Sequence, residues 1–461
     1  MNSIPWNYAP YRPYFYEVGD IYVCRISPTE NEFTVEWLDI NEEYTVFLKK
    51  RDENEFREVL KTTDNFCTIK DLEENTEYEF YVQAGDKKSR TRIVRCGEHE
   101  GVAVNYLHPE DDAYAFSGHF LCSPSLVKHP DGYLLASMDL FAGDYPQNLT
   151  LIYRSDDGGE TWHYVSELMP CFWGKLFIHK NELYMISVST EYGDLLIGKS
   201  LDGGKTFTSP VTILRGANGK HGECGVHKNP QNVLVYNNRI YITIEWGSWG
   251  RCYHAPTVIS CDCDSDLLDY TNWVIPHPVK YDPNWEGTAK GKSTGNLEGT
   301  LVVSPENEVL NVMRYQTENC EPRYGLALVY KVDTENVHNS IKYHYAMEFP
   351  ANLSKFMIKK DEKTGLYYSI CSRITDPENI RARNLVSLMV SKDLKKWNLV
   401  CDLIDKRHED SKKVGFQYVD FEFDGDDIIW LCRTAQNGSS TYHNTNLITF
   451  HRTKNFRDIK G

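Results

Sequence analysis

One eight-residue pattern occurs twice in this chain, forty-five residues apart, and it restricts the possible folds more than any other feature. Residues 155–162 read SDDGGETW, and residues 200–207 read SLDGGKTF. A looser copy, SKDLKKW, follows at residues 391–397. Serine and aspartate side chains can hydrogen-bond to the backbone of a turn, and glycine takes a positive φ. Each copy therefore predicts a tight hairpin closed by an aromatic side chain, and the repetition predicts a fold built from similar units.

A longer repeat agrees with this prediction. An apolar strand, a polar turn and a second apolar strand recur six times, with about fifty to seventy residues from turn to turn, which suits four-stranded units. These hairpins are predicted at residues 126–135, 176–185, 233–242, 301–310, 356–368 and 421–430. We therefore predict an all-β chain in which residues 119–461 form a six-bladed β-propeller, with five blades as the alternative count.

The N-terminal part of the chain has a different pattern. Residues 1–96 contain short segments in which apolar and polar residues alternate, as in half-buried strands. Leu72, Thr76 and Tyr78 have a spacing that resembles the tyrosine corner of fibronectin type III domains, in which the tyrosine hydroxyl bonds back to the backbone. We predict a small fibronectin type III-like β-sandwich here, followed by a linker at residues 97–118.

Composition excludes several classes of partner. The formal net charge of −16 argues against nucleic acid and anionic membranes, and no apolar stretch is long enough to cross a bilayer. The first residues lack the basic and apolar regions of a signal peptide, so we expect a cytoplasmic protein whose thirteen cysteines are mostly reduced. Cys261 and Cys263 are close in sequence, but no histidine lies at a ligand spacing from them. We therefore expect no metal and no other cofactor.

Charged residues recur at one position of the predicted hairpins. When the hairpins are aligned by their second strands, the same register holds Asp139, Glu245, Arg314 and Arg433, with Arg373 one residue later. Equivalent positions in a propeller face the same end of its central channel, so these two acids and three arginines are expected to converge. Such a set is either a structural ring of salt bridges or a binding site for an anionic substrate.

The repeated octapeptide resembles the Asp box of the sialidase superfamily of β-propellers. On that resemblance, Asp144 is the acid/base residue, Glu298 is the base that assists the nucleophile, and Tyr418 is the nucleophile. Arg314, sixteen residues after Glu298, and Arg383, eight residues before the third copy of the octapeptide, match arginines that bind the substrate carboxylate. The resemblance implies an exo-acting, retaining glycoside hydrolase that releases a terminal, acidic sugar from an oligosaccharide or glycoconjugate.

The chemistry of this set is coherent. The anomeric carbon of a sialoside carries a carboxylate, which would repel an anionic nucleophile, so a neutral tyrosine is paired with a glutamate base. Glu298 would take the proton of Tyr418, whose unperturbed pKa is near 10, during the attack. Asp144 would protonate the leaving oxygen and then activate water, which gives net retention.

One part of the family pattern is missing. The first arginine of sialidases opens the first blade, and the matching position here is Cys122. Arg373 or Arg433 could supply the third guanidinium group from another blade. The substitution makes another 2-keto-3-deoxy sugar, a uronic acid or a neutral sugar a candidate substrate beside sialic acid.

Several further residues are candidates for the site. Glu245 has an aromatic neighbour, Trp246, as sugar-binding loops often do, and Lys355 begins the fifth inner strand, where it would add positive charge. Two alternative functions follow from these residues. One is a non-catalytic glycan-binding propeller, and the other is a propeller glycosidase or lyase whose mechanism uses Asp139, Glu245 or His227.

Overall fold

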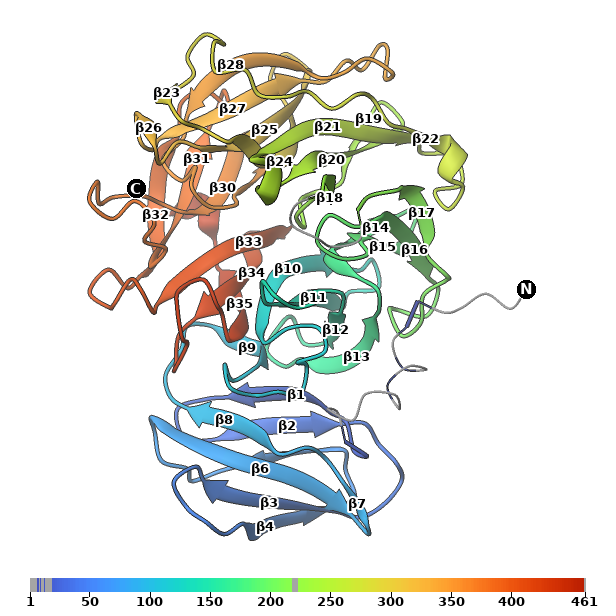
Figure 1. Cartoon of the computed structure of the whole chain (residues 1–461), viewed down its shortest axis with the longest axis vertical. Coiled ribbons are helices and arrows are strands. Elements are labelled where there is room, and N and C mark those ends of the chain that lie inside the picture. Colours follow the sequence, from blue (N-terminus) through green and yellow to red (C-terminus); the bar gives the residue numbers. More distant parts are fainter. Residues whose placement is uncertain (1–5, 8, 10–11, 13–18, 218–222, 460–461) are drawn as a thin grey trace.

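The computed structural model describes residues 6–7, 9, 12, 19–217 and 223–459 (Figure 1). The ends of the two predicted domains, residues 1–5 and 460–461, lie outside the described residues. The described part of the chain is mainly β-structure, and its helices are three short 3₁₀ turns: η3 (Trp249–Arg251), η4 (Tyr270–Asn272) and η5 (Phe456–Asp458). The prediction of an all-β chain is confirmed.

Two sheets face each other in the N-terminal domain, at the bottom of Figure 1. One sheet consists of β1, β2 and β5, and the other consists of β3, β4, β6, β7 and β8. Their bounds are β1 (Val23–Pro28), β2 (Phe33–Trp37), β3 (Tyr44–Lys50), β4 (Arg57–Thr62), β5 (Phe66–Ile69), β6 (Thr76–Ala84), β7 (Lys87–Lys88) and β8 (Arg92–Cys96).

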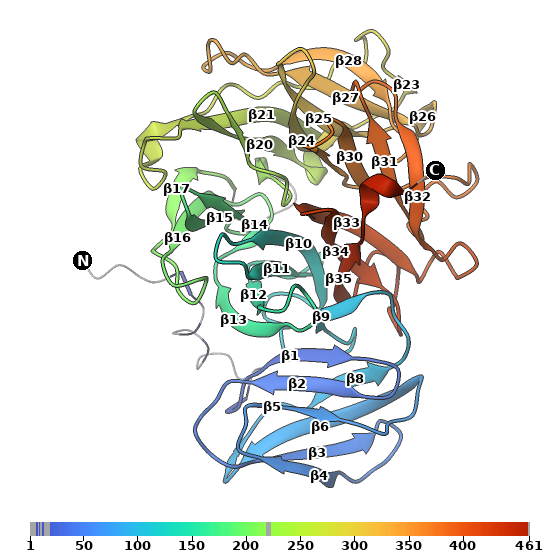
Figure 2. The same ribbon diagram turned by 180° about the vertical axis from the view of Figure 1, so that it is seen from behind.

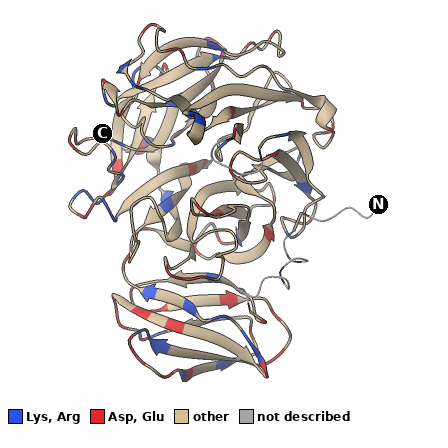
Figure 3. Cartoon of the chain, viewed as in Figure 1, with Lys and Arg blue, Asp and Glu red and all other residues tan. Residues whose placement is uncertain are grey.

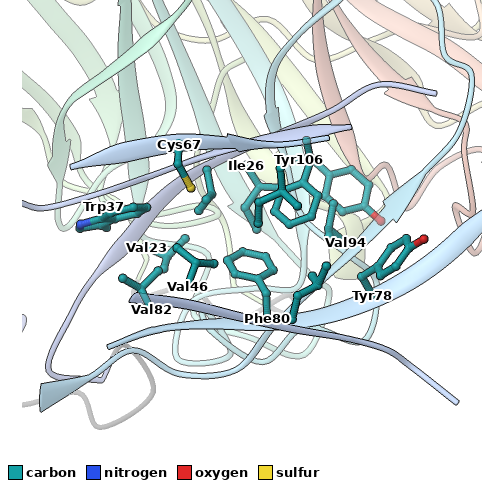
Figure 4. Close-up of a cluster of buried hydrophobic side chains, with 14 of the residues drawn as sticks. Val23, Ile26, Trp37, Val46, Cys67, Tyr78, Phe80, Val82, Val94 and Tyr106 are labelled. Atoms are coloured by element: carbon teal, nitrogen blue, oxygen red, sulfur yellow. The ribbon is translucent and has the colours of Figure 1, made fainter. Parts of the chain in front are cut away.

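The core of this domain lies between the two sheets because successive side chains of a strand point to opposite faces. In β6, Tyr78, Phe80 and Val82 are buried, whereas the residues between them are partly exposed. Figure 4 shows them in one cluster with Trp37 from the opposite sheet. The Tyr78 hydroxyl accepts a hydrogen bond of 2.8 Å from the backbone N–H of Glu73, so the predicted tyrosine corner is confirmed.

The rest of the described chain forms six larger antiparallel sheets and a two-stranded ribbon of β23 (Lys290–Gly291) and β26 (Cys320–Glu321). The first sheet contains β10 (Phe120–Lys128), β11 (Leu134–Phe141), β12 (Thr150–Ser155) and β13 (His163–Leu168). The second sheet contains β14 (Phe172–His179), β15 (Glu182–Val188), β16 (Leu195–Ser200) and β17 (Val211–Leu214). The third sheet contains β18 (Gly225–His227), β19 (Leu234–Tyr236), β20 (Arg239–Ser248), β21 (Tyr253–Asp262) and β22 (Trp273–Val274). The fourth sheet contains β24 (Gly295–Val303), β25 (Val309–Gln316), β27 (Leu326–Lys331) and β28 (Lys342–Glu348). The fifth sheet contains β29 (Met357–Lys360), β30 (Tyr367–Ser372), β31 (Leu385–Ser391) and β32 (Asn398–Asp405). The sixth sheet contains β33 (Gly415–Asp424), β34 (Asp427–Ala435), β35 (Leu447–Thr453) and β9 (Val102–Tyr106).

These six sheets surround a common centre (Figures 1 and 2). Strand β10 contacts β14, strands β20 and β21 contact β24, and β24 contacts β29; the circle closes through contacts of β33 with β29, β30 and β10. We call the ring formed by the first strands β10, β14, β18, β24, β29 and β33 the hub. Each predicted hairpin corresponds to an antiparallel pair, although in the third sheet the predicted first strand is β19 and the strand at the hub is β18.

Strand β9 corrects the predicted linker at residues 97–118. It pairs with β35 as the outer strand of the sixth sheet, so a segment that precedes the first sheet completes the last one. Tyr106 at the end of β9 also packs in the core of the N-terminal domain (Figure 4), and Arg25 Nε donates a 2.9 Å hydrogen bond to the carbonyl of Val104. The prediction of a linker was wrong for these residues because the strand with which they pair lies far along the chain, and no local sequence pattern indicates that pairing.

Four of the hub strands carry the same irregularity near their first residues. Each has a break in register, which marks a β-bulge, in β10, β14, β24 and β33. At each break one non-glycine residue has a positive φ: Ser123 at 50°, Trp173 at 50°, Glu298 at 56° and Tyr418 at 57°. This conformation is uncommon for such residues, and a bulge changes the direction of a side chain. Glu298 and Tyr418 therefore occupy equivalent places in two different sheets.

The repeated octapeptide lies between the third and fourth strands of its sheets. In the first copy, Ser155 Oγ accepts a 2.8 Å hydrogen bond from the N–H of Gly159, and Asp157 accepts a 3.0 Å bond from that of Thr161. Gly159 has a φ of 102°, and Trp162 is fully buried beneath the turn. The second copy makes the same bonds. The motif therefore stabilises the hairpins that join the third and fourth strands of these sheets, away from the first strands that form the hub.

Charge is not concentrated in one domain. Figure 3 shows acidic and basic residues scattered over the N-terminal sandwich and over the six sheets. No helix in the described ranges is both long and apolar enough to span a membrane.

Candidate active site

Three polar side chains from the fourth and sixth sheets, which lie on either side of the fifth, converge at the hub. The Tyr418 hydroxyl donates a 2.5 Å hydrogen bond to Glu298 Oε1, and Arg314 Nη1 donates 2.7 Å to Glu298 Oε2. The same Arg314 nitrogen lies 3.3 Å from the Tyr418 hydroxyl oxygen. Strands β24 and β33 present Glu298 and Tyr418 through their bulges, and β25 presents Arg314. The three residues predicted from widely separated segments are thus brought into one hydrogen-bonded group.

Burial and neighbouring charges give Glu298 and Tyr418 opposite pKa shifts. Burial alone would raise the pKa of Glu298, but the charge of Arg314, followed by that of His227 and the hydrogen bonds from Tyr418 and Arg314, lowers it overall. Burial and the Glu298 carboxylate raise the pKa of Tyr418 to about 12, against the lowering effect of three arginines. At neutral pH the site therefore contains a carboxylate acceptor and a neutral phenol, as a tyrosine nucleophile with a glutamate base requires.

Two more arginines adjoin Tyr418. The guanidinium carbon of Arg433 lies 5.2 Å from the centre of the Tyr418 ring, and the Arg383 side chain bonds to the side chain of Gln417 and to the carbonyl of Leu353. Burial, followed by repulsion from Arg314, lowers the pKa of Arg383 to about 10. Three cationic side chains around one phenol form an environment suited to a carboxylate ligand.

Arg433 also lies near Cys122, the position at which the family pattern has an arginine. Burial raises the pKa of the Cys122 thiol to about 12, and Arg433 is close enough for its charge to oppose that rise. The Arg433 guanidinium lies 5.1 Å from the ring of Phe141 and donates to the carbonyl of His443 at 2.5 Å. An arginine from the sixth sheet is thus placed beside the cysteine of the first sheet.

Two predicted cationic residues are not part of this group. Arg373 Nη2 lies 2.8 Å from Asp402 Oδ1, and Arg373 Nε donates to the Ser387 hydroxyl, so it belongs to a salt bridge within the fifth sheet. Lys355 is buried, which lowers its pKa to about 8, and it donates a 3.0 Å bond to the carbonyl of Val419. Arg373 thus lies in a salt bridge within the fifth sheet and Lys355 supports the backbone next to Tyr418, while their roles in substrate binding stay predictions.

The two acids of the predicted ring also have structural partners. Asp139 Oδ2 accepts a 2.8 Å hydrogen bond from the N–H of Trp173, and Glu245 Oε1 accepts a 3.3 Å bond from the N–H of Gly299. Both acids are buried, and burial raises the pKa of Asp139 to about 7. The Asp139 carboxylate holds the bulge of the next sheet, and its role in binding substrate stays a prediction.

Asp144 stands apart from the central group. It is exposed in the loop between β11 and β12, and it has no hydrogen bond to Glu298 or Tyr418. The loop begins immediately after Phe141, whose ring contacts Arg433, so Asp144 lies at the same end of the hub as the phenol. The role of Asp144 stays a prediction.

Trp246 packs beside the apolar cluster of the second and third sheets, and its role in binding substrate stays a prediction. Trp173 is the tryptophan at the hub, with the ring of His227 4.4 Å away. Sequence analysis also missed His443, a half-buried residue whose pKa burial and the charges of Arg433 and Arg383 lower to about 2. A loop position without a periodic pattern gave no signal for it.

Within the described ranges, no three His, Cys, Asp or Glu side chains are grouped closely enough to hold a metal ion. The cysteines, all of which lie in those ranges, are free thiols.

Comparisons with known proteins agree with the sheet topology. Residues 20–95 match the family described as fibronectin type III domain, and a search of curated proteins found no match. Among solved structures, an α-L-arabinanase of Penicillium chrysogenum complexed with arabinobiose matches with 15% identity and a TM-score of 0.51, covering 78% of this chain and 98% of that one. The six sheets therefore have a β-propeller-like fold.

Two further solved structures are similar to a lesser degree. An α-L-arabinofuranosidase of Fusarium graminearum, in complex with an iminosugar inhibitor, has 14% identity and a TM-score of 0.48, covering 77% of this chain and 96% of that one. A sialidase of Trypanosoma rangeli in complex with sialic acid has 14% identity and a TM-score of 0.47, covering 73% of this chain and 54% of that one.

Proposed function

We propose that the hub site is that of an exo-acting, retaining glycoside hydrolase that releases a terminal acidic sugar. The observation that carries the proposal is the hydrogen-bonded group of Tyr418, Glu298 and Arg314, in which a neutral phenol touches a carboxylate. A protein that only bound a glycan would not need a buried base against a phenol. The solved structure with the matching fold is named an α-L-arabinanase, an enzyme that cleaves glycosidic bonds, which agrees with this class of enzyme.

In the proposed reaction, the Tyr418 oxygen attacks the anomeric carbon while its proton passes to Glu298. The glycosidic bond breaks, and its oxygen leaves with a proton from Asp144. Water then loses a proton to Asp144 and attacks the same carbon, and Tyr418 leaves and recovers its proton from Glu298. Two displacements on one carbon give net retention of configuration.

Three arginines support an acidic sugar as substrate. Arg314, Arg383 and Arg433 surround the phenol, and forked guanidinium groups bind carboxylates through paired hydrogen bonds. Arg433 would replace the arginine that the family pattern has at Cys122.

We further propose that the six sheets are the six blades of one propeller, and that the N-terminal sandwich supports its first and last blades through β9.

Aryl glycosides of N-acetylneuraminic acid, 2-keto-3-deoxynononic acid and glucuronic acid would test the proposal. We expect the wild-type protein to cleave at least one of them with retention, as followed by proton NMR, and Tyr418→Phe to lower kcat/KM by at least about 100-fold. Tyr367→Phe is the matched control, because its hydroxyl bonds to the carbonyl of Val303 inside the sheets. Full turnover by Tyr418→Phe would refute the nucleophile.

A further inference from the structure

A second group of buried side chains lies at the hub beside the proposed catalytic residues. It belongs to the second and third sheets and contains His227, Glu245 and the half-buried Trp173. His227 Nδ1 donates a 2.7 Å hydrogen bond to Glu245 Oε2, and the His227 ring lies 4.4 Å from the Trp173 ring. The proposed hydrolysis uses none of the three residues.

One of the two imidazole nitrogens of His227, Nε2, does not take part in the hydrogen bond to Glu245. Only 2% of the residue is exposed, and its Nε2 has no hydrogen-bond partner among residues 19–217 and 223–459. This nitrogen is not one of the fully enclosed, unpaired side-chain atoms of the described residues, so it keeps contact with solvent and is open to a ligand. The carboxylate of Glu245 fixes which ring nitrogen carries the proton and how the ring is turned.

Two contacts connect this histidine to the reacting end of the site. Glu245 accepts from His227 with one oxygen and from the N–H of Gly299, the residue after Glu298, with the other. The charge of His227 also contributes to the lowered pKa of Glu298. A sugar whose anomeric carbon faces Tyr418 would therefore have His227 within its reach.

Trp173 is held in place by charged groups of both neighbouring sheets. Its backbone N–H donates to Asp139 Oδ2 at 2.8 Å, and its backbone carbonyl accepts from Lys228 Nζ at 2.7 Å. Both of these charged residues are buried, and Trp173 has the positive φ that Glu298 and Tyr418 have in their own sheets. These contacts fix the position of Trp173 at a bulge equivalent to those that carry Glu298 and Tyr418.

We propose that His227 and Trp173 form a sugar-binding subsite, in which Nε2 of His227 hydrogen-bonds to a hydroxyl of the sugar ring and the indole packs against that ring. Glu245 is the positioning residue of the subsite. A hydroxyl fits either protonation state of the imidazole, because it both donates and accepts hydrogen bonds. The inference rests on the proposed function for the placement of the sugar.

Binding of free sugars tests the subsite without turnover. N-Acetylneuraminic acid, 2-keto-3-deoxynononic acid and glucuronic acid would be titrated into the wild-type protein and into His227→Phe by calorimetry. We expect the substitution to weaken binding of the best sugar by about tenfold or more. His179→Phe is the matched control, because His179 ends β14 at the strand end opposite Trp173 and bonds to the carbonyl of Cys263.

Monodeoxy analogues of the same sugar identify the hydroxyl. The wild-type protein should lose about tenfold in affinity for one analogue, and His227→Phe should bind that analogue and the parent sugar equally, since the pair no longer interacts. Equal losses for each analogue in both proteins would overturn the subsite. Should His227→Phe fold poorly, His227→Gln keeps a polar side chain of similar length and should show an intermediate loss, whereas unchanged affinity would count against the proposal.

The outcomes separate the two proposals. Binding that depends on His227, without cleavage of any aryl glycoside, would leave the subsite standing and reject the hydrolase. Cleavage that His227→Phe does not alter, together with unaltered sugar affinity, would reject the subsite alone. No binding of any of these sugars to the wild-type protein would overturn the subsite as stated.

Discussion

Two halves of the hub use the same register position in different ways. In the fourth and sixth sheets the position holds Arg314 and Arg433, which lie against Tyr418. In the first and third sheets it holds Asp139 and Glu245, which accept hydrogen bonds from the bulge backbone of the next sheet. One half therefore places cations beside the Tyr418 phenol, and the other directs its acids to the backbone of the next sheet.

The difference follows from side-chain length and from which groups lack partners. An arginine is long enough to extend from its own strand to a phenol on another, and its guanidinium group has five N–H donors, more than Arg433 uses on Thr445 and His443. An aspartate or glutamate is shorter, and a buried carboxylate must find donors nearby, which the N–H groups at a bulge supply. Charged residues at one register position thus lie at the proposed site in two sheets and support the backbone of the next sheet in two others.

The largest effect that separates the halves is expected at Arg433. Arg433→Met should lower kcat/KM by about 100-fold or more, because one forked donor to the substrate carboxylate is lost. Arg373→Met is the control, since its salt bridge with Asp402 lies within the fifth sheet, and it should keep activity close to that of the wild type. Equal losses in the two variants, measured with the best aryl glycoside, would break the comparison.

The acids should affect stability more than chemistry. Asp139→Ala removes the acceptor for the N–H of Trp173 and for the Thr150 hydroxyl, so we expect a loss of about 1–3 kcal/mol in the free energy of unfolding. Chemical denaturation measures that loss, and kcat/KM should change by less than about tenfold, about 1.4 kcal/mol of barrier. A loss of activity as large as that of Arg433→Met, with stability unchanged, would place Asp139 among the catalytic groups.

The pH dependence sharpens the assignment of Arg314. Because the pKa of Glu298 is lowered from its ordinary 4.5, the acidic limb of kcat/KM should lie below pH 4.5. The shift contributes stability above the unfolded pKa, and that contribution is lost as the pH falls through the folded pKa. Arg314→Met should move the acidic limb upward, since burial would then act on Glu298 with less opposition. An unmoved limb would show that another group controls it.

The smallest effect is expected at the repeated octapeptide. Asp157→Ala removes bonds to the backbone and the hydroxyl of Thr161, and should cost about 1 kcal/mol in the free energy of unfolding without changing kcat/KM. Asp202→Ala in the second copy should behave alike, which provides an internal control. A change in activity would mean that these hairpins, at the strand ends away from the hub, influence the site.

Much of the candidate site could be predicted from the sequence because the proposed catalytic residues lie in recognisable local contexts. Glu298 and Arg314 are sixteen residues apart on the two strands of one hairpin, so their approach follows from strand pairing alone. Tyr418 was placed by its strand and by the family pattern. Asp144 was placed by the same reasoning, but its loop is exposed and its distance from the phenol depends on loop conformation.

The sequence by itself determined the all-β class, the repeated hairpins, the octapeptide turns and the tyrosine corner, because each depends on residues close together along the chain. Only the tertiary structure decided that β9 completes the sixth sheet, that Arg433 lies beside Cys122, and that His227 bonds to Glu245 near Glu298. These contacts join segments distant in sequence, and their geometry is set when the sheets pack in a circle and the bulges redirect the side chains at its centre.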